Sequence, residues 1–121
     1  MNYYFSTTLA MDFDKAIEAT TAALKEEGFG VLTEIDIAQT MKKKLDVDLP
    51  KYKILGACNP QYAYKIGTML PCNVIVQDAG GGKVEVSAVN PLASMQAVEN
   101  PELGTLAQEV TEKLKRMISS L

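Results

Sequence analysis

The first part of the chain alternates between a strand-like and a helix-like pattern of apolar positions. Residues 3–9 alternate in polarity and are rich in aromatic and β-branched side chains, as is typical of a strand. Asp12 can then cap a helix in which mostly apolar residues recur at spacings of three and four, and Gly28 can end that helix in the left-handed conformation. The sequence therefore predicts a strand followed by an amphipathic helix.

The next segment predicts a second strand, a second helix and a third strand. Strict alternation over residues 29–35 would place Val31 and Ile35 on one face of the second strand and Glu34 on the other. Asp36 followed by Gln39 resembles a capping box, which indicates a helix that Pro50 closes. Residues 52–57 then have the pattern of a strand.

Three Asn-Pro pairs mark the second half, at residues 59–60, 90–91 and 100–101. In each pair, the asparagine can cap a helix and the proline fits the first helical position. The first helix has room for about two turns before Gly67, the second for about two turns, and the third is long and amphipathic. Residues 70–77 and 83–89 are strand-like, and the glycine-rich segment 78–82 between them favours a hairpin.

Together these elements predict a single α+β domain over residues 1–121, in the order β-α-β-α-β-(short α)-β-β-α. Because this order combines crossovers with a hairpin, we expect an open mixed β-sheet covered by helices. A chain of 121 residues suits one hydrophobic core, and its 47% hydrophobic and 22% charged residues are typical of a globular protein.

Composition and charge narrow the classes of function. Apolar runs are far shorter than the roughly 20 residues that cross a bilayer, and the N-terminus lacks the pattern of a signal peptide, so we expect a cytoplasmic protein without a membrane partner. The net charge of -3 disfavours nucleic-acid binding. The basic run 42–44 is flanked by Asp46 and Asp48, which indicates the solvated side of a helix.

The chain has no histidine, which removes the commonest general base near neutral pH and excludes Ser-His-Asp and Cys-His arrangements within it. A carboxylate with a raised pKa is the remaining candidate base, and Glu34 qualifies because it lies in mid-strand. The other interpretation of Glu34 is an exposed strand residue or a salt-bridge partner. The triple glycine before Lys83 lacks the other residues of a phosphate-binding loop.

The two cysteines, Cys58 and Cys72, lie at strand ends, and each precedes an asparagine, Asn59 and Asn73. Their strand parity is compatible with the core, where a free cysteine packs as a small hydrophobe. Alternatively, Cys58 lies at the start of the helix after Pro60, whose dipole would stabilise a thiolate, and the two cysteines form a thiol or soft-metal site. Two thiolates alone leave zinc short of ligands, so a metal would need Asp or Glu, or a second subunit, and we assign no metal-ligating residues and no cofactor.

Several strings carry a family resemblance: EGFGVLTEID at residues 27–36, YKILGACNP at 52–60, LPCNVIV at 70–76, and the Asn-Pro pairs at 90–91 and 100–101, the latter followed by Glu102-Leu103. With them the chain resembles, over nearly its whole length, the bacterial and archaeal family called domain of unknown function three-zero-two. The resemblance implies a compact α+β domain, often homodimeric, with no established activity. Members usually have a longer helical stretch after the Cys-Asn-Pro string, so we expect a shortened helix after Pro60.

Our first hypothesis is a non-enzymatic homodimer that binds a small ligand or a metal near Cys58 and Cys72, with Glu34, Asn59 and Asn73 as further candidate ligand-binding residues. The competing hypotheses are an enzyme or redox protein using thiol or carboxylate chemistry at Cys58, Cys72 and Glu34, and a structural or regulatory interaction module. A binding domain requires a partly apolar cavity, and an enzyme requires an exposed residue with a shifted pKa. An interaction module requires an extended apolar surface.

Overall fold

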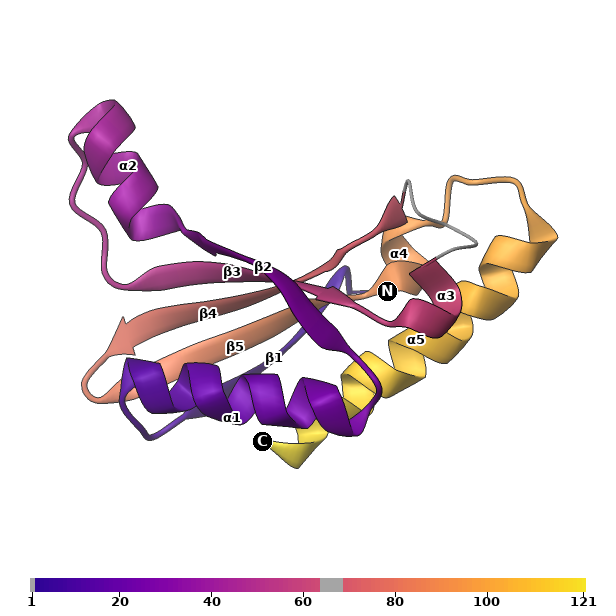
Figure 1. Ribbon diagram of the computed structural model, residues 1–121, viewed down its shortest axis with the longest axis horizontal. Coiled ribbons are helices and arrows are strands. Elements are labelled where there is room, and N and C mark those ends of the chain that lie inside the picture. Colours follow the sequence, from indigo (N-terminus) through magenta and orange to yellow (C-terminus); the bar gives the residue numbers. More distant parts are fainter. Residues whose placement is uncertain (1, 64–68) are drawn as a thin grey trace.

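The computed structural model describes residues 2–63 and 69–121, and its elements follow the predicted order (Figure 1). They are β1 (Tyr4–Leu9), α1 (Phe13–Glu26), β2 (Gly30–Asp36), α2 (Ile37–Leu45), β3 (Tyr52–Cys58), α3 (Pro60–Ala63), β4 (Cys72–Gly80), β5 (Lys83–Val89), α4 (Pro91–Ser94) and α5 (Pro101–Ser120). The α+β class is confirmed. The part of the helix after Pro60 that was expected to reach Gly67 lies outside the described residues from position 64 onward.

The strands form one open sheet in the order β1-β5-β4-β3-β2, and every pairing among the described strands is antiparallel. The expected open sheet is therefore present, but it is antiparallel rather than mixed. The reason lies in the α1 crossover, which carries the chain across the whole sheet from β1 at one edge to β2 at the other. These two strands run in the same direction without being neighbours, so the crossover creates no parallel pair.

The predicted caps begin the helices. Among the described residues, five side chains accept a backbone N–H at a helix start, and they are Asp12, Asp36, Asn59, Asn90 and Asn100. Gly28 follows α1 with a φ of 87°, a conformation that residues with a side chain rarely adopt. Helix α2 ends earlier than Pro50 suggested, because Asp46 takes a left-handed φ of 52° directly after Leu45.

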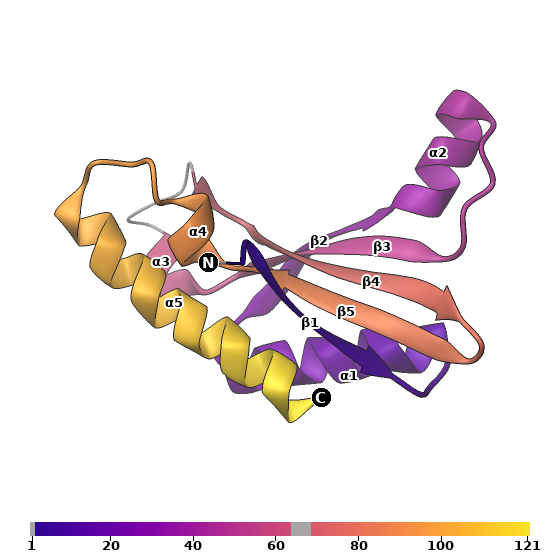
Figure 2. The ribbon, with the colours of Figure 1, turned by 180° about the vertical axis from the view of Figure 1, so that it is seen from behind.

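One face of the sheet is covered by α1 and α5 and holds the hydrophobic core (Figure 1). Alternate residues of the three central strands enter this core, namely Leu55, Ala57, Cys72, Val74, Val76, Val84, Val86 and Ala88. The opposite face of the sheet is seen in Figure 2, where no helix formed by the described residues covers β1, β5 and β4. The alternate side chains of the central strands, which include Ile54 and Ile75, therefore lie on an uncovered face.

A bulge in β2 changes which of its side chains share a face. Val31 pairs with Ala57, and Glu34 pairs with Leu55, with a register shift between Val31 and Thr33. Because Ala57 and Leu55 are both core residues, Val31 and Glu34 lie on the helix-covered face. The expectation that Val31 shares a face with Ile35 was wrong, because strict alternation does not survive an inserted residue. The inserted Leu32 is 69% exposed.

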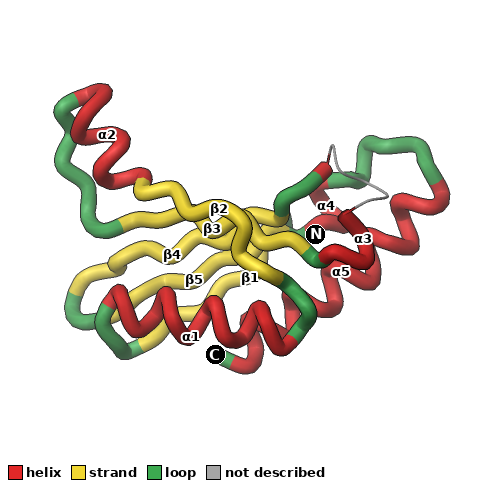
Figure 3. Tube along the Cα trace, in the orientation of Figure 1, coloured by secondary structure: helices red, strands yellow, loops and turns green. Residues whose placement is uncertain are grey.

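Helix α2 and the connection that follows it, residues 37–51, project from the end of the sheet and are called the arm below (Figures 1 and 3). The helix contains no buried residue, although its apolar positions recur as predicted. Leu45 is 65% exposed, and Val47 and Leu49 of the connection are also exposed. None of the helices formed by the described residues is long and apolar enough to span a membrane.

A buried hydrogen-bond network joins the chain before β1 to α4 and α5. Asn90 donates from Nδ2 to the carbonyl oxygen of Asn2 at 2.8 Å. Its Oδ1 accepts from the amide of Leu92 at 3.2 Å and from the hydroxyl of Thr111 at 3.3 Å. Since Thr111 Oγ1 also accepts from the Leu92 amide at 3.2 Å, α4 is fixed to α5.

Two buried threonines provide a matched test of this network. Thr20 Oγ1 in α1 is buried and has no hydrogen-bond partner, whereas Thr111 is fully engaged. We expect Thr20→Val to leave the free energy of unfolding unchanged or to raise it by about 1 kcal/mol, because an unpaired buried hydroxyl is removed. Thr111→Val should lower it by about 1–3 kcal/mol. Urea denaturation measures both, and equal losses in the two variants would contradict this assignment.

Candidate functional site

Cys72 begins β4 and its side chain lies in the core, on the face it shares with Val74 and Val76. It pairs with the buried Ala57 and is only 3% exposed. Burial raises the pKa of the Cys72 thiol to about 11, and Cys58 adds to the shift through charge repulsion. At neutral pH this thiol is therefore protonated and weakly nucleophilic.

Cys58 ends the neighbouring strand β3 and is half-buried. It follows Ala57 directly, so strand alternation directs its side chain away from the core face that Ala57 and Cys72 share. The structure therefore brings the two cysteines to adjacent strand ends but assigns their side chains to opposite faces. Within residues 2–63 and 69–121, no three Cys, Asp or Glu side chains form a group that could hold a metal ion.

Asn59 is buried, and both ends of its side-chain amide are engaged. Nδ2 donates to the carbonyl oxygen of Glu27 at 3.4 Å, and Oδ1 accepts from the amide of Gln61 at 3.3 Å. A Cβ atom at Gly28 would come within 3.1 Å of Nδ2. Asn59 therefore connects the turn after α1 to the start of α3, and its polar atoms are committed to that connection.

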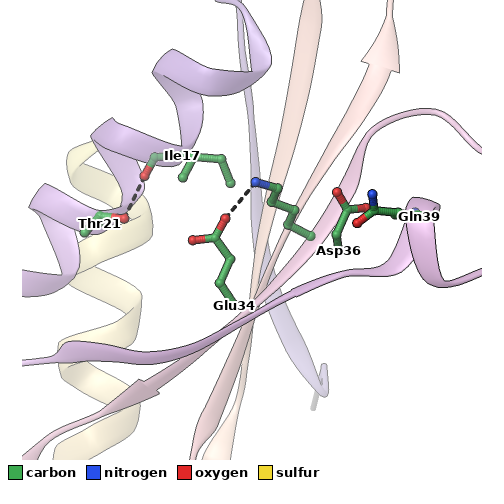
Figure 4. Close-up of polar contacts among 6 residues, drawn as sticks. Ile17, Thr21, Glu34, Asp36 and Gln39 are labelled. Carbon is green, nitrogen blue, oxygen red and sulfur yellow. Dashed lines mark hydrogen bonds and ion pairs between the residues drawn. The ribbon is translucent and has the colours of Figure 1, made fainter.

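Glu34 lies on the helix-covered face of β2 and forms an ion pair with Lys53 of β3, with Oε1 and Nζ 2.7 Å apart. Figure 4 shows this contact between Ile17 and Thr21 of α1 on one side and Asp36 with Gln39 on the other. The hydrogen bond to Glu34 raises the pKa of Lys53, while desolvation opposes the shift. This geometry is that of a salt-bridge partner.

A cavity of about 400 Å³ lies where β4 begins and β5 ends, beside α4, and it is called the Cys72 cavity below. Cys72 and Asn73 line it together with Met69, Ser94 and Met95, and the rest of its described wall is aliphatic or proline. Among the described residues, no charged side chain lines it, and neither Glu34 nor Cys58 reaches it. A mainly apolar cavity with a few polar groups is the usual form of a small-ligand site.

Met69, Ser94 and Met95 were missed by reasoning from the sequence. The Asn-Pro pair at 90–91 predicted α4, but only the folded chain shows that the end of α4 and the start of β4 line the same cavity. A sequence signal did exist in the apolar residues at both ends of the Pro71-Cys72-Asn73 string. That signal is indistinguishable from ordinary core packing.

A second cavity, of about 320 Å³, lies between the first turn of α1, the arm and β3. Its wall carries charges of both signs, from Asp14, Asp36, Lys51 and Lys53, beside the ring of Phe13. Lys51 Nζ lies 5.9 Å from the centroid of that ring. The charges on this wall can pair with one another and with solvent, so the Cys72 cavity is the stronger candidate for a small ligand.

The buried thiol makes stability depend on pH in a defined window. The folded state holds the Cys72 proton up to a pKa of about 11, whereas the unfolded chain releases it near 9.0, so stability falls as pH rises between these values. From about pH 8.5 to about pH 10.5 we expect a loss of about 2 kcal/mol that is absent in Cys72→Val and present in Cys58→Ser. Urea denaturation of the three proteins at both pH values measures it. The same pH dependence in Cys72→Val would contradict the assignment.

Comparison with known proteins agrees with this architecture. The chain matches the family described as Domain of unknown function DUF302 over residues 5–121. Its fold is similar to that in the crystal structure of the uncharacterized conserved protein DUF302 from Bacillus stearothermophilus, with 24% sequence identity, a TM-score of 0.87 and 98% of each chain covered. A search of curated proteins finds no match. Because the family match spans nearly the whole chain, the protein belongs to the DUF302 family.

Proposed function

We propose that this DUF302 protein is a cytoplasmic, non-enzymatic homodimer that binds a small ligand in the Cys72 cavity. The observation that carries the proposal is the cavity itself, which has a volume of about 400 Å³ and combines an apolar wall with the thiol of Cys72 and the polar side chains of Asn73 and Ser94. Its size falls within the range of small-molecule sites. Asn73 and Ser94 are exposed, so they can orient a ligand that enters from solvent.

Binding is favoured over catalysis by the state of the candidate residues. Burial keeps the Cys72 thiol protonated, and Glu34 is paired with Lys53 outside the Cys72 cavity. Cys58 belongs to the other face of the sheet and does not line the cavity. An enzyme of the thiol or carboxylate type needs an activated group inside the cavity.

The chemistry of the wall restricts the ligand. Since no described lining residue is charged, a bound ligand that kept a net charge would lose its hydration without a compensating partner. We therefore expect the ligand to be small and to have no net charge in its bound state. The polar atoms of an organic ligand would face Asn73 and Ser94.

Indole is a suitable neutral probe of the Cys72 cavity. Titration of the protein with indole, followed by amide NMR shifts, should give saturable changes centred on Cys72, Asn73 and Met95. Ser94→Phe fills the cavity from α4 and should weaken binding at least about tenfold, which is about 1.4 kcal/mol. Ser120→Phe, at the exposed end of α5, is the matched control and should bind as the natural protein does. Shifts centred elsewhere, or unchanged binding by Ser94→Phe, would refute the cavity as the site.

The arm supports the homodimer. Helix α2 has nine residues and none is buried, yet isolated helices of this length are marginal in water. Its exposed apolar residues continue through Ile35, also exposed, onto the uncovered face of the sheet. A single partner can therefore cover the arm and the uncovered sheet face together. A second copy of the chain has the same two apolar surfaces and can be that partner. A two-fold dimer uses the same surface on each copy, so each arm would be buried against its partner.

Leu45→Glu tests the arm without disturbing the isolated fold, because Leu45 is largely exposed in the single chain. A buried, unpaired carboxylate in the dimer interface should weaken self-association at least about 100-fold, or about 2.7 kcal/mol. Lys43→Glu changes charge on the same helix and should leave the dimer in place. Sedimentation velocity over a range of concentrations measures the dissociation constant. A natural protein that stays monomeric would contradict the homodimer and favour the interaction module, with the arm binding a different protein.

A further inference from the structure

Three sulfur-containing residues from three separate segments line the Cys72 cavity. Met69 precedes the Leu70-Pro71 pair, Cys72 begins β4, and Met95 caps the end of α4. All three line the cavity. Cys72 and Met95 are buried, and Met69 packs against the same small apolar cluster as Met95. The cavity lining therefore contains one thiol and two thioether groups.

The donor set discriminates sharply between metal ions. Calcium and magnesium need several oxygen ligands, and the described wall offers side-chain oxygens only from Asn73 and Ser94. A closed zinc site needs four ligands from thiolate, imidazole or carboxylate groups, and the described wall has one such group. A thiolate with thioethers suits a soft ion, and Cu(I) is the common soft ion of biology that takes such ligands.

We propose that the Cys72 cavity binds one Cu(I) ion through the sulfur atoms of Met69, Cys72 and Met95. The proposal rests on the proposed function, because it places the ion in the same cavity, where the cation and the Cys72 thiolate together carry no net charge. In the binding step the S–H bond of Cys72 breaks, its proton passes to solvent, and the thiolate electron pair forms a bond to the copper. The two thioethers donate lone pairs, and the metal stays Cu(I), so no electron is transferred.

Charge balance favours this ion over others in an apolar site. A monovalent cation and one thiolate sum to zero net charge, which a wall without described charged side chains accommodates at low cost. A divalent cation bound to the same thiolate would keep an uncompensated positive charge. The released proton also makes binding tighter as pH rises, because the metal competes with the proton for Cys72.

The alternative explanation is that the methionines only fill space, since methionine adapts to irregular gaps in a core. The two explanations differ in what conservative substitutions do. Leucine matches methionine closely in volume, so Met95→Leu and Met69→Leu preserve packing while they remove a donor atom. Copper affinity should respond to these variants, while the free energy of unfolding should change little.

The experiment is an anaerobic titration of the reduced full chain with Cu(I) in competition with bathocuproine disulfonate. We expect one equivalent bound, with X-ray absorption showing sulfur as the only ligand atom type. Cys72→Val should weaken binding at least about 100-fold, and Met95→Leu and Met69→Leu at least about fivefold each. Cys58→Ser and Met41→Leu are the controls, because Cys58 lies on the other face and Met41 on the arm, and both should bind as the natural protein does.

Several results would overturn the proposal. These are the absence of Cu(I) binding against the competitor, full affinity in Cys72→Val, or equal losses in Met95→Leu and Met41→Leu. Nitrogen or oxygen as the main ligand type would overturn it as well. Indole binding without Cu(I) binding would remove the copper site and leave the ligand cavity standing. Failure of both would remove the cavity as a functional site.

Discussion

The buried side-chain amide of Asn90 is the interaction on which the candidate site depends. It accepts from Leu92 at the start of α4 and from Thr111 of α5, and it donates to the chain before β1. A single short helix of four residues has almost no stability of its own, so α4 lies against α5 because this network holds it there. The wall that Ser94 and Met95 contribute to the Cys72 cavity follows from that placement. Asn59 has the same role at the start of α3, where it joins the turn after α1.

Local chemistry accounts for the part of the fold that could be predicted from the sequence. The caps at Asp12, Asp36, Asn90 and Asn100 act within a few residues, and each begins a helix at the expected place. The hairpin between β4 and β5 is also local, because Gly81 and Gly82 both take positive φ. The order of strands depends instead on which edge of the sheet the α1 crossover reaches. The pattern of apolar and polar residues along the sequence does not indicate that edge. The antiparallel hairpin was therefore predicted correctly, while the sheet as a whole was wrongly expected to be mixed.

The candidate site was predictable only in part, for the same reason. The Cys58 and Cys72 strings did come to adjacent strand ends, because β3 and β4 pair through Ala57 and Cys72. The face that each thiol takes depends on which residues of β3 enter the core, and Leu55 and Ala57 take those places rather than Ile54. Asn59 shows the limit of reasoning from motifs. It lies in one of the sequence strings that carry the family resemblance, but its side chain connects two parts of the fold and does not line the Cys72 cavity. That Met69 and Met95 line the Cys72 cavity could not be predicted, because it depends on where α4 packs and no local sequence pattern indicates this.

The bulge at Leu32 has a consequence for how molecules of this protein can associate. An edge strand with a regular row of free amides and carbonyls is a template on which further strands add without limit, as in fibrils. In β2 the inserted residue interrupts that row and adds local twist, so a foreign strand would need a matching register shift to pair along it. Ordered growth through this edge is therefore disfavoured, and the exposed apolar surface of the arm is less prone to cause open-ended polymerisation along β2.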